Sequence, residues 1–344
     1  MARKTNKVLQ TTEEEIKLIL PENIELMEEF LDYLESTDHS PTSINVYKNN
    51  LYIFFVYCQK HLKNKDFVNI KKRDIINFQG YMVKNELSPA RIKNIKSTLS
   101  SMSNFIENVL DEDEKWENFK NIINKIPSPA KQEVREKTVL EDDDCQRLLD
   151  YLVDNKMYQQ ACVFALAWAS GRRKSELLRI KRSHISDENL MYGSLYKTPE
   201  KIKTKGKGKG KFLYVYILKT KFKKYFDLWM EEREKLGVPD DIDHIFVSKK
   251  KTGWQPMKIS TLDSWTVKFS EILGVPFYFH CLRHNFTTAM HKANIPASVI
   301  KDLIGWESLE MVSIYTDVEV DDELGKYFSE DGIKQIETKS LAEL

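Results

Sequence analysis

Apolar residues recur at helical spacing through the first third of the chain. "ENIELMEEFLDYLE" follows directly on Pro21, and "SPTSINVYKNNLYIFFVYCQKHL" and "SPARIKNIKSTLSSMSNFIENVL" each open on Ser-Pro, a frequent start of a helix. Another helical pattern, "KKRDIINFQGYMVKN", lies between them. Helices joined by such short connections predict a compact helical domain over residues 22–126, preceded by an N-terminal extension at 1–21.

This pattern stops at "NKIPSPAKQEVREKTVL", where two prolines and mixed charges indicate a linker over 127–137. A second domain is predicted over 138–320. It starts with "EDDDCQRLLDYLVD", whose acids stand at a helix N-terminus, where the helix dipole favours them. A tail over 321–344 has an amphipathic run near 322–337, which predicts another helix.

The second domain mixes helical and strand patterns. A buried helix is predicted at 158–169, short strands around "LMYGSLY" and "KFLYVYIL", and helices at 219–234, 260–273, 281–292, 296–303 and 308–316. The predicted fold is therefore mainly α with a small antiparallel β-sheet, built as a helical domain followed by a mixed α/β domain.

Composition is that of an ordinary soluble protein, with 41% hydrophobic and 31% charged residues. The four cysteines have neither paired spacing nor zinc-site spacing, which suits a reducing compartment. The N-terminus lacks the apolar run of a signal peptide, and the apolar stretch "ACVFALAWA" is under half of a membrane span. A cytoplasmic protein without membrane association is expected.

Net charge is only +1, but the charges are segregated. Residues 60–96 carry ten Lys/Arg against three acids, and residues 197–224 carry eleven lysines against Glu200. Such clusters are solvated helix faces and loops in many proteins, and they are also what an anion-binding face shows. The residues of the first cluster chosen as candidate DNA contacts are Lys71, Lys72, Arg73, Arg91, Lys93 and Lys96.

Candidate chemistry lies in the second domain. "SGRRKSE" places two arginines after a glycine, "HCLRH" puts His280 and Arg283 one helical turn apart, and "LIGWESLEMVSIYTD" contains Trp306 and Tyr315. Alone, Tyr315 would be interpreted as a packing residue. A phenol becomes a nucleophile only where its developing charge is stabilised, and paired guanidinium groups match a phosphate in both shape and charge.

The lysine-glycine run "TKGKGKGKF" could supply the remaining part, a lysine that protonates a leaving alkoxide. The alternative interpretation of this run is a solvated loop tip without a chemical role. His280 and His284 stand at i and i+4, but no Glu of a His-Glu-x-x-His motif and no third ligand accompanies them, so no metal site is expected. No other cofactor is expected either.

The order Arg, Lys, His-x-x-Arg, Trp, Tyr resembles the tyrosine recombinases. "SGRRKSE" is similar to the family's Thr-Gly-Leu-Arg-x-Ser-Glu, which matches Arg173 to the first catalytic arginine and Glu176 to the supporting acid; Arg172 falls on a variable position. "HCLRH" is similar to the His-x-Leu-Arg-His box, and "LIGW" to Leu-Gly-His with Trp306 in place of histidine.

This resemblance implies a helical core-binding domain and a catalytic domain in which Tyr315 attacks a DNA phosphate. It also implies a specific recombination site in duplex DNA as substrate, a tetramer on that DNA, and a tail that docks on a neighbouring protomer. The lysine that protonates the leaving group would be Lys207 if the run is aligned with the family's turn without a gap. Because the run repeats every two residues, an alignment shifted by two residues leaves Lys205 open as the alternative. Two other functions stay open: a type IB topoisomerase or telomere-resolvase-like strand transferase, and a catalytically silent DNA-binding protein of the same fold.

Overall fold

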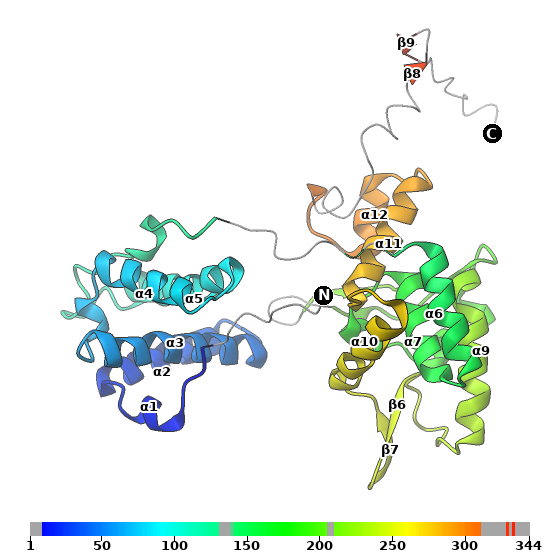
Figure 1. Cartoon of the computed structure of the whole chain (residues 1–344), viewed down its shortest axis with the longest axis horizontal. Coiled ribbons are helices and arrows are strands. Elements are labelled where there is room, and N and C mark those ends of the chain that lie inside the picture. Colours follow the sequence, from blue (N-terminus) through cyan, green and yellow to red (C-terminus); the bar gives the residue numbers. More distant parts are fainter. Residues whose placement is uncertain are drawn as a thin grey trace. The chain divides into compact units, whose positions relative to one another are not determined.

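The computed structural model describes residues 9–130, 138, 140–204 and 210–310, and short strands at 328–329 and 332–333. The chain forms two compact units, one before and one after the stretch 131–137 (Figure 1). Each unit has a hydrophobic core of its own.

Helices make up the regular structure of the first unit. They are α1 (Glu13–Lys17), α2 (Pro21–Ser36), α3 (Pro41–His61), α4 (Lys72–Lys84) and α5 (Pro89–Val109), with 3-10 turns at Phe67–Asn69 and Ile123–Lys125. The Ser-Pro prediction is confirmed. The hydroxyl of Ser40 accepts a hydrogen bond from the Ser43 amide, and that of Ser88 accepts one from the Arg91 amide, both at 3.2 Å.

Aromatic rings fill the middle of this unit. Phe54 on α3 contacts Phe78 on α4 with ring centroids 5.1 Å apart, and Phe30 on α2 contacts Phe105 on α5 at 5.6 Å. All four rings are buried, so the apolar faces predicted from the sequence do meet in one core.

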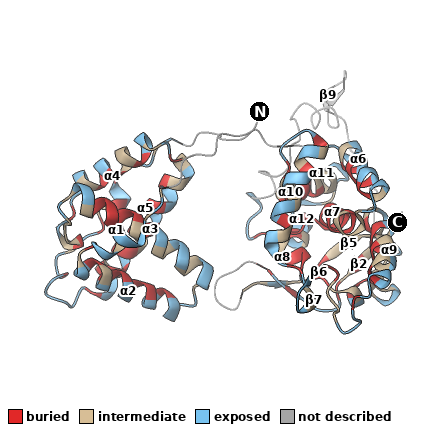
Figure 2. Ribbon diagram, turned by 60° about the horizontal axis from the view of Figure 1, so that its bottom comes forward, coloured by how far each residue is buried: buried red, intermediate tan, exposed pale blue. Residues whose placement is uncertain are grey.

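The second unit is built around one helix that is buried on every side. Its helices are α6 (Asp142–Asp154), α7 (Tyr158–Ser170), α8 (Lys174–Leu177), α9 (Lys219–Lys235), α10 (Ile259–Leu273), α11 (Phe279–Lys292) and α12 (Ala297–Ile304). Every residue of 161–170 is buried, and α6, α9 and α11 pack around α7 (Figure 2). A helix without a polar face belongs in a core, as "ACVFALAWA" predicted.

Small antiparallel sheets flank these helices. One has the order β1-β2-β5, from Leu190–Met191, Leu195–Lys197 and Tyr216–Leu218. Two hairpins are β3 (Ile202–Lys203) with β4 (Phe212–Leu213), and β6 (Val247–Lys250) with β7 (Gly253–Pro256). The predicted fold class, mainly α with a small antiparallel sheet, is confirmed.

The end of the chain differs from its prediction where it is described. The run 322–337 was predicted as a helix, yet β8 (Phe328–Ser329) pairs antiparallel with β9 (Gly332–Ile333). The amphipathic spacing of 322–337 therefore did not predict the strands that the structure shows at 328–329 and 332–333. Of the helix predicted at 308–316, only residues 308–310 fall within the described part.

In the part of the chain that the structure describes, no helix has the length and apolarity needed to cross a membrane.

Candidate functional site

The site begins at the glycine that ends α7. Gly171 has φ +59°, the left-handed conformation that closes a helix. A Cβ at this position would lie 2.8 Å from Cδ1 of Phe286 on α11, so only glycine lets the two helices come this close. The chain then turns into α8, and Arg172 and Arg173 occupy the turn.

Arg173 is held by the carboxylate of Glu176. Its Nη1 donates to Glu176 Oε1 at 3.0 Å, and its backbone N–H donates to Oε2 at 3.3 Å. The Arg173 side chain is 34% exposed, whereas that of Glu176 is 1% exposed. A buried carboxylate thus orients a guanidinium whose remaining surface is open to solvent.

Arg172 lies in the interior, which its variable position in the family pattern did not suggest. Its side chain is only 1% exposed, and its Nη2 donates to the backbone oxygens of Leu303 (2.5 Å) and Tyr214 (3.1 Å). Burial lowers the pKa of this guanidinium from its usual value, while the nearby Glu176 opposes that shift. In the local sequence, only the doubled arginine could have indicated that one of the two guanidinium groups is buried.

The first turns of α11 carry His280 and Arg283. Arg283 is fully buried, and it donates from Nη1 to Gly171 O (3.1 Å) and from Nη2 to Ile304 O (3.2 Å). Burial, reinforced by the charges of Arg283, His284 and Arg173, lowers the pKa of His280 to about 4. His280 is therefore neutral at pH 7, and it lies in the field of both arginines.

Trp306 lies beside Arg283 at the end of α12. The centroid of its ring is 5.3 Å from Arg283 Cζ, a cation–π distance, and its backbone N–H donates to Lys301 O at 2.9 Å. Gly305 precedes it with φ +80°, and a Cβ there would overlap Cδ1 of Leu213 on β4. The end of α12 and the β3–β4 hairpin are therefore in direct contact.

That hairpin carries the lysine-glycine run. At its root the amide of Thr204 donates to Lys211 O at 2.6 Å, and Lys211 Nζ donates to Gly305 O at 3.3 Å. Lys205 and Lys207 lie outside the described residues, as does Tyr315. Lys211 was not among the sequence-based candidates, although it ends the same lysine-glycine repeat.

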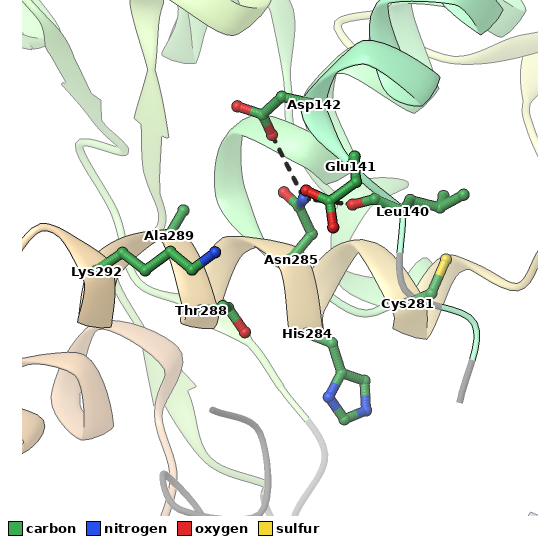
Figure 3. Close-up of a pocket in the computed structure, with 9 residues that line it drawn as sticks. All are labelled: Leu140, Glu141, Asp142, Cys281, His284, Asn285, Thr288, Ala289 and Lys292. Carbon is green, nitrogen blue, oxygen red and sulfur yellow. Dashed lines mark hydrogen bonds between the residues drawn. The ribbon is translucent and has the colours of Figure 1, made fainter. Parts of the chain in front are cut away.

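A polar network fixes the other face of α11 to the start of the second unit. Asn285 donates to Leu140 O at 2.8 Å and accepts from Trp168 Nε1 at 2.9 Å (Figure 3 shows the first of these bonds). Lys221 lies 3.9 Å from the centroid of the Trp168 ring and pairs with Asp142 at 3.0 Å. A cavity of about 320 Å³ opens on this face, and His280, Arg283 and Trp306 do not line it.

No three His, Cys, Asp or Glu side chains gather as a metal-binding group anywhere in the described ranges. The rings of His280 and His284 meet edge to face, with centroids 5.7 Å apart. The charges that lower the pKa of His280 include those of the Arg283 and Arg173 guanidinium groups, a setting that suits an anion.

One of the DNA-contact candidates needs correction. Lys96 is buried at 4% exposure, and its ammonium donates to Gln79 Oε1 (2.8 Å), Ile126 O (2.8 Å) and Pro127 O (3.1 Å). Three oxygen acceptors converge on it because the chain after α5 folds back over that helix. Lys71, Lys72, Arg73 and Lys93 are exposed, and Arg91 is half-buried with Nη1 bonded to Asn94.

Comparisons with known proteins agree with this architecture. The phage integrase family model matches residues 138–321, and the model of a phage integrase N-terminal SAM-like domain matches residues 26–116. The SPbeta prophage-derived recombinase-like protein YomM of Bacillus subtilis is 31% identical over 274 residues, which cover 78% of each chain. Tyrosine recombinase XerA of Pyrococcus furiosus is 25% identical over 294 residues, covering 86% of this chain and 90% of XerA.

Solved structures share the fold. A XerH site-specific recombinase bound to a palindromic difH substrate is similar with a TM-score of 0.64 and 20% identity, covering 88% of this chain and 84% of that one. A lambda integrase from a tetramer bound to a Holliday junction gives 0.61 and 16%, covering 86% and 77%. The chain therefore has the fold of these solved recombinases. It belongs to the phage integrase family, the tyrosine recombinases, and is a recombinase enzyme.

Proposed function

We propose that the chain is a site-specific DNA recombinase that cleaves and rejoins duplex DNA through a 3′-phosphotyrosyl intermediate, using its own cations and no metal or ATP. One observation carries the proposal. Arg173 and His280–Arg283 come from distant parts of the sequence, yet His280 lies in the field of both guanidinium groups, and Arg283 is bonded to the glycine beside the arginine turn.

In this proposal the scissile phosphate binds between Arg173 and Arg283. Two guanidinium groups would neutralise the charge that grows on the non-bridging oxygens in the transition state. The buried carboxylate of Glu176 holds Arg173, and the exposed side of the Arg173 guanidinium would contact the phosphate. The indole N–H of Trp306 is suited to donate another hydrogen bond to the phosphate.

The chemical step is a transfer between oxygens. The Tyr315 oxygen would pass its proton to the neutral imidazole of His280 or to solvent, attack phosphorus and form a phosphotyrosine ester, while the bond from phosphorus to the 5′-oxygen breaks. Lys207 or Lys205 would protonate that oxygen, and the reverse attack by a 5′-hydroxyl from another strand would reseal the DNA. His280, neutral at pH 7, is suited to accept a hydrogen bond from the phenol or donate one to the phosphate.

The two arginines differ in their access to the substrate. Arg173 is one-third exposed, whereas Arg283 is fully buried and donates to backbone oxygens. A phosphate would therefore meet Arg173 first. Contact with Arg283 would follow a rearrangement of the α12 end and Trp306, which lie against it.

The helical unit would contribute a phosphate-contacting surface, which we name the basic face: Lys71, Lys72, Arg73, Arg91 and Lys93. Four of these residues are exposed and Arg91 is half-buried, and cations at the start of α4 and α5 would give affinity that depends on salt but not on sequence. The similarity to a XerH recombinase bound to a palindromic difH substrate and to a lambda integrase tetramer bound to a Holliday junction supports an assembly of several protomers on DNA.

Formation of a covalent adduct tests the proposal. Duplexes selected by the protein from a randomised pool are incubated with the wild type and with Tyr315→Phe, and a denaturing gel separates protein–DNA adducts. We expect an adduct with the wild type alone. An adduct that persists in the Phe variant would assign the nucleophile to another residue, and no adduct with any selected duplex would point to a silent DNA-binding protein.

A plasmid with two copies of the selected site distinguishes recombination from topoisomerase activity. Exchange between the copies, read from restriction fragments, is the expected outcome. Relaxation of supercoils without exchange would instead identify a nicking-closing enzyme.

A further inference from the structure

Arg172 has no role in the mechanism proposed above, and it falls on a variable position of the family pattern. A buried guanidinium with imperfect partners is unfavourable compared with an apolar side chain of similar volume. Among the described residues, Arg172 Nε and Nη1 make no hydrogen bond, and the nearest acid is Glu176, whose Oε2 lies 4.0 Å from Nη1. Stability alone therefore does not explain an arginine here.

Its contacts join segments that carry the site. Leu303, whose oxygen accepts from Nη2, is in the last turn of α12, and Trp306 follows three residues later. Tyr214, whose oxygen also accepts from Nη2, lies between β4 and β5, directly after the hairpin that carries the lysine-glycine run. One guanidinium thus connects the lysine hairpin with the end of α12.

A second buried guanidinium completes the arrangement. Arg283 donates to Ile304 O, the carbonyl next to Leu303 O, and also to Gly171 O. The last carbonyls of a helix have no partner within the helix, and cations at this end are favoured by the helix dipole. Two adjacent carbonyls of α12 are therefore held by two arginines, and one of these sits next to Arg173 in the sequence.

We propose that Arg172 is a positioning residue that sets the end of α12 and the root of the lysine hairpin relative to the Arg173–Glu176 pair. It touches no substrate. Glu176 would be shared between Arg172 and Arg173, so that its carboxylate keeps a cation nearby when Arg173 turns towards a phosphate. The inference rests on the proposed function, because the position it sets is that of the cleavage chemistry.

The test compares Arg172→Met with Arg172→Lys and a matched control, Arg233→Met. Arg233 is also buried in the second unit and donates to the backbone oxygens of Ile242 and His244, away from α12. Each variant is measured by urea unfolding, by hydrogen exchange of the DNA-free protein, and by adduct formation in a single turnover with saturating protein on the selected duplex.

We expect Arg172→Met to remain folded and to bind the duplex with unchanged affinity, but to form adduct about tenfold to hundredfold more slowly. Faster exchange is expected at the amides of Gly305 and Trp306, which donate to Lys301 O at 2.8 and 2.9 Å. Arg172→Lys should recover part of the rate, since an ammonium can reach one carbonyl but cannot reproduce the fork. Arg233→Met should cleave at the wild-type rate.

Two results would overturn the inference. One is unchanged hydrogen exchange at the amides of Gly305 and Trp306 in Arg172→Met. The other is a loss of cleavage rate that is the same in Arg172→Met and Arg233→Met for the same loss in free energy of unfolding. If Arg172→Met fails to fold, hydrogen exchange and the rate of adduct formation are measured on Arg172→Lys instead. If the wild type itself forms no adduct, the proposed function fails, while the exchange data still decide whether Arg172 holds the end of α12.

Discussion

Arg283 on α11 donates a hydrogen bond from Nη1 to the backbone oxygen of Gly171, 3.1 Å away and 112 positions earlier in the chain. The same glycine lies against Phe286, one turn further along α11. Since Arg172 and Arg173 follow Gly171 directly, this contact fixes α11 relative to both arginines. The behaviour of the site under mutation depends on it.

Gly171→Ala should destabilise the second unit far more than a comparable change elsewhere. A left-handed residue with a Cβ costs about 1 kcal/mol, and the 2.8 Å approach to Phe286 adds overpacking of about 1–3 kcal/mol. Gly274, which ends α10 with φ +72° and has open space within 4 Å of the position that a Cβ would take, is the matched control. Urea unfolding gives the free energy of unfolding of both variants. Equal losses of this free energy would show that Phe286 moves away from the added Cβ at little cost.

His280 should make stability sensitive to mild acid. Its pKa falls from 6.5 to about 4 on folding, so between these values the unfolded chain binds a proton that the folded chain does not. Stability contributed by the neutral imidazole is then lost as pH drops through this window. His280→Gln should lose less stability than wild type between pH 7 and pH 5. Parallel losses in urea unfolding would contradict the shift.

Lys96 and Lys93 should separate folding from DNA binding. Lys96→Met leaves buried oxygens without their donor and should lower stability by about 1–3 kcal/mol, with no change in the salt dependence of DNA binding. Lys93→Met, an exposed change on the same helix, should leave stability unaltered. It should reduce the slope of log affinity against log salt by about one. The reverse pattern would remove Lys93 from the basic face.

The acid of the lysine hairpin can be assigned with a modified substrate. Replacing the bridging 5′-oxygen by sulfur gives a leaving group that departs without protonation. If Lys207 is the acid, Lys207→Met cleaves the ordinary substrate slowly and the sulfur substrate at the wild-type rate, while Lys205→Met is normal on both. Arg173→Lys serves as the control that sulfur does not rescue. Normal cleavage by both lysine variants would turn attention to Lys211 at the hairpin root.

The C-terminal tail should serve assembly rather than binding to a single site. If the tail docks on a neighbouring protomer, as the resemblance to the family implies, truncation before Glu323 should leave one-protomer DNA complexes intact and remove larger ones. Native gels or sedimentation on a selected duplex give the answer. Loss of the smallest complex on truncation would assign the tail to its own domain instead.

Local signals in the sequence were enough for most helices. Ser40 and Ser88 cap α3 and α5 as predicted, and the apolar run of α7 is buried throughout. Arg172 and Lys96 were not predictable in the same way. Sequence shows that a residue is charged, but backbone oxygens from other segments decide whether the charge is buried, and those oxygens come together only in the folded chain.

The close approach that Gly305 allows to Leu213 has a consequence for timing. Because Gly305 has no side chain, Leu213 on β4 lies directly against the backbone at the end of α12, so a displacement of the lysine hairpin would also displace that backbone. In the proposed reaction the tyrosine oxygen attacks phosphorus on one side, and the lysine protonates the leaving 5′-oxygen on the opposite side. In that reaction, a shift at the contact between Gly305 and Leu213 would therefore alter the positions of the acid and the nucleophile together.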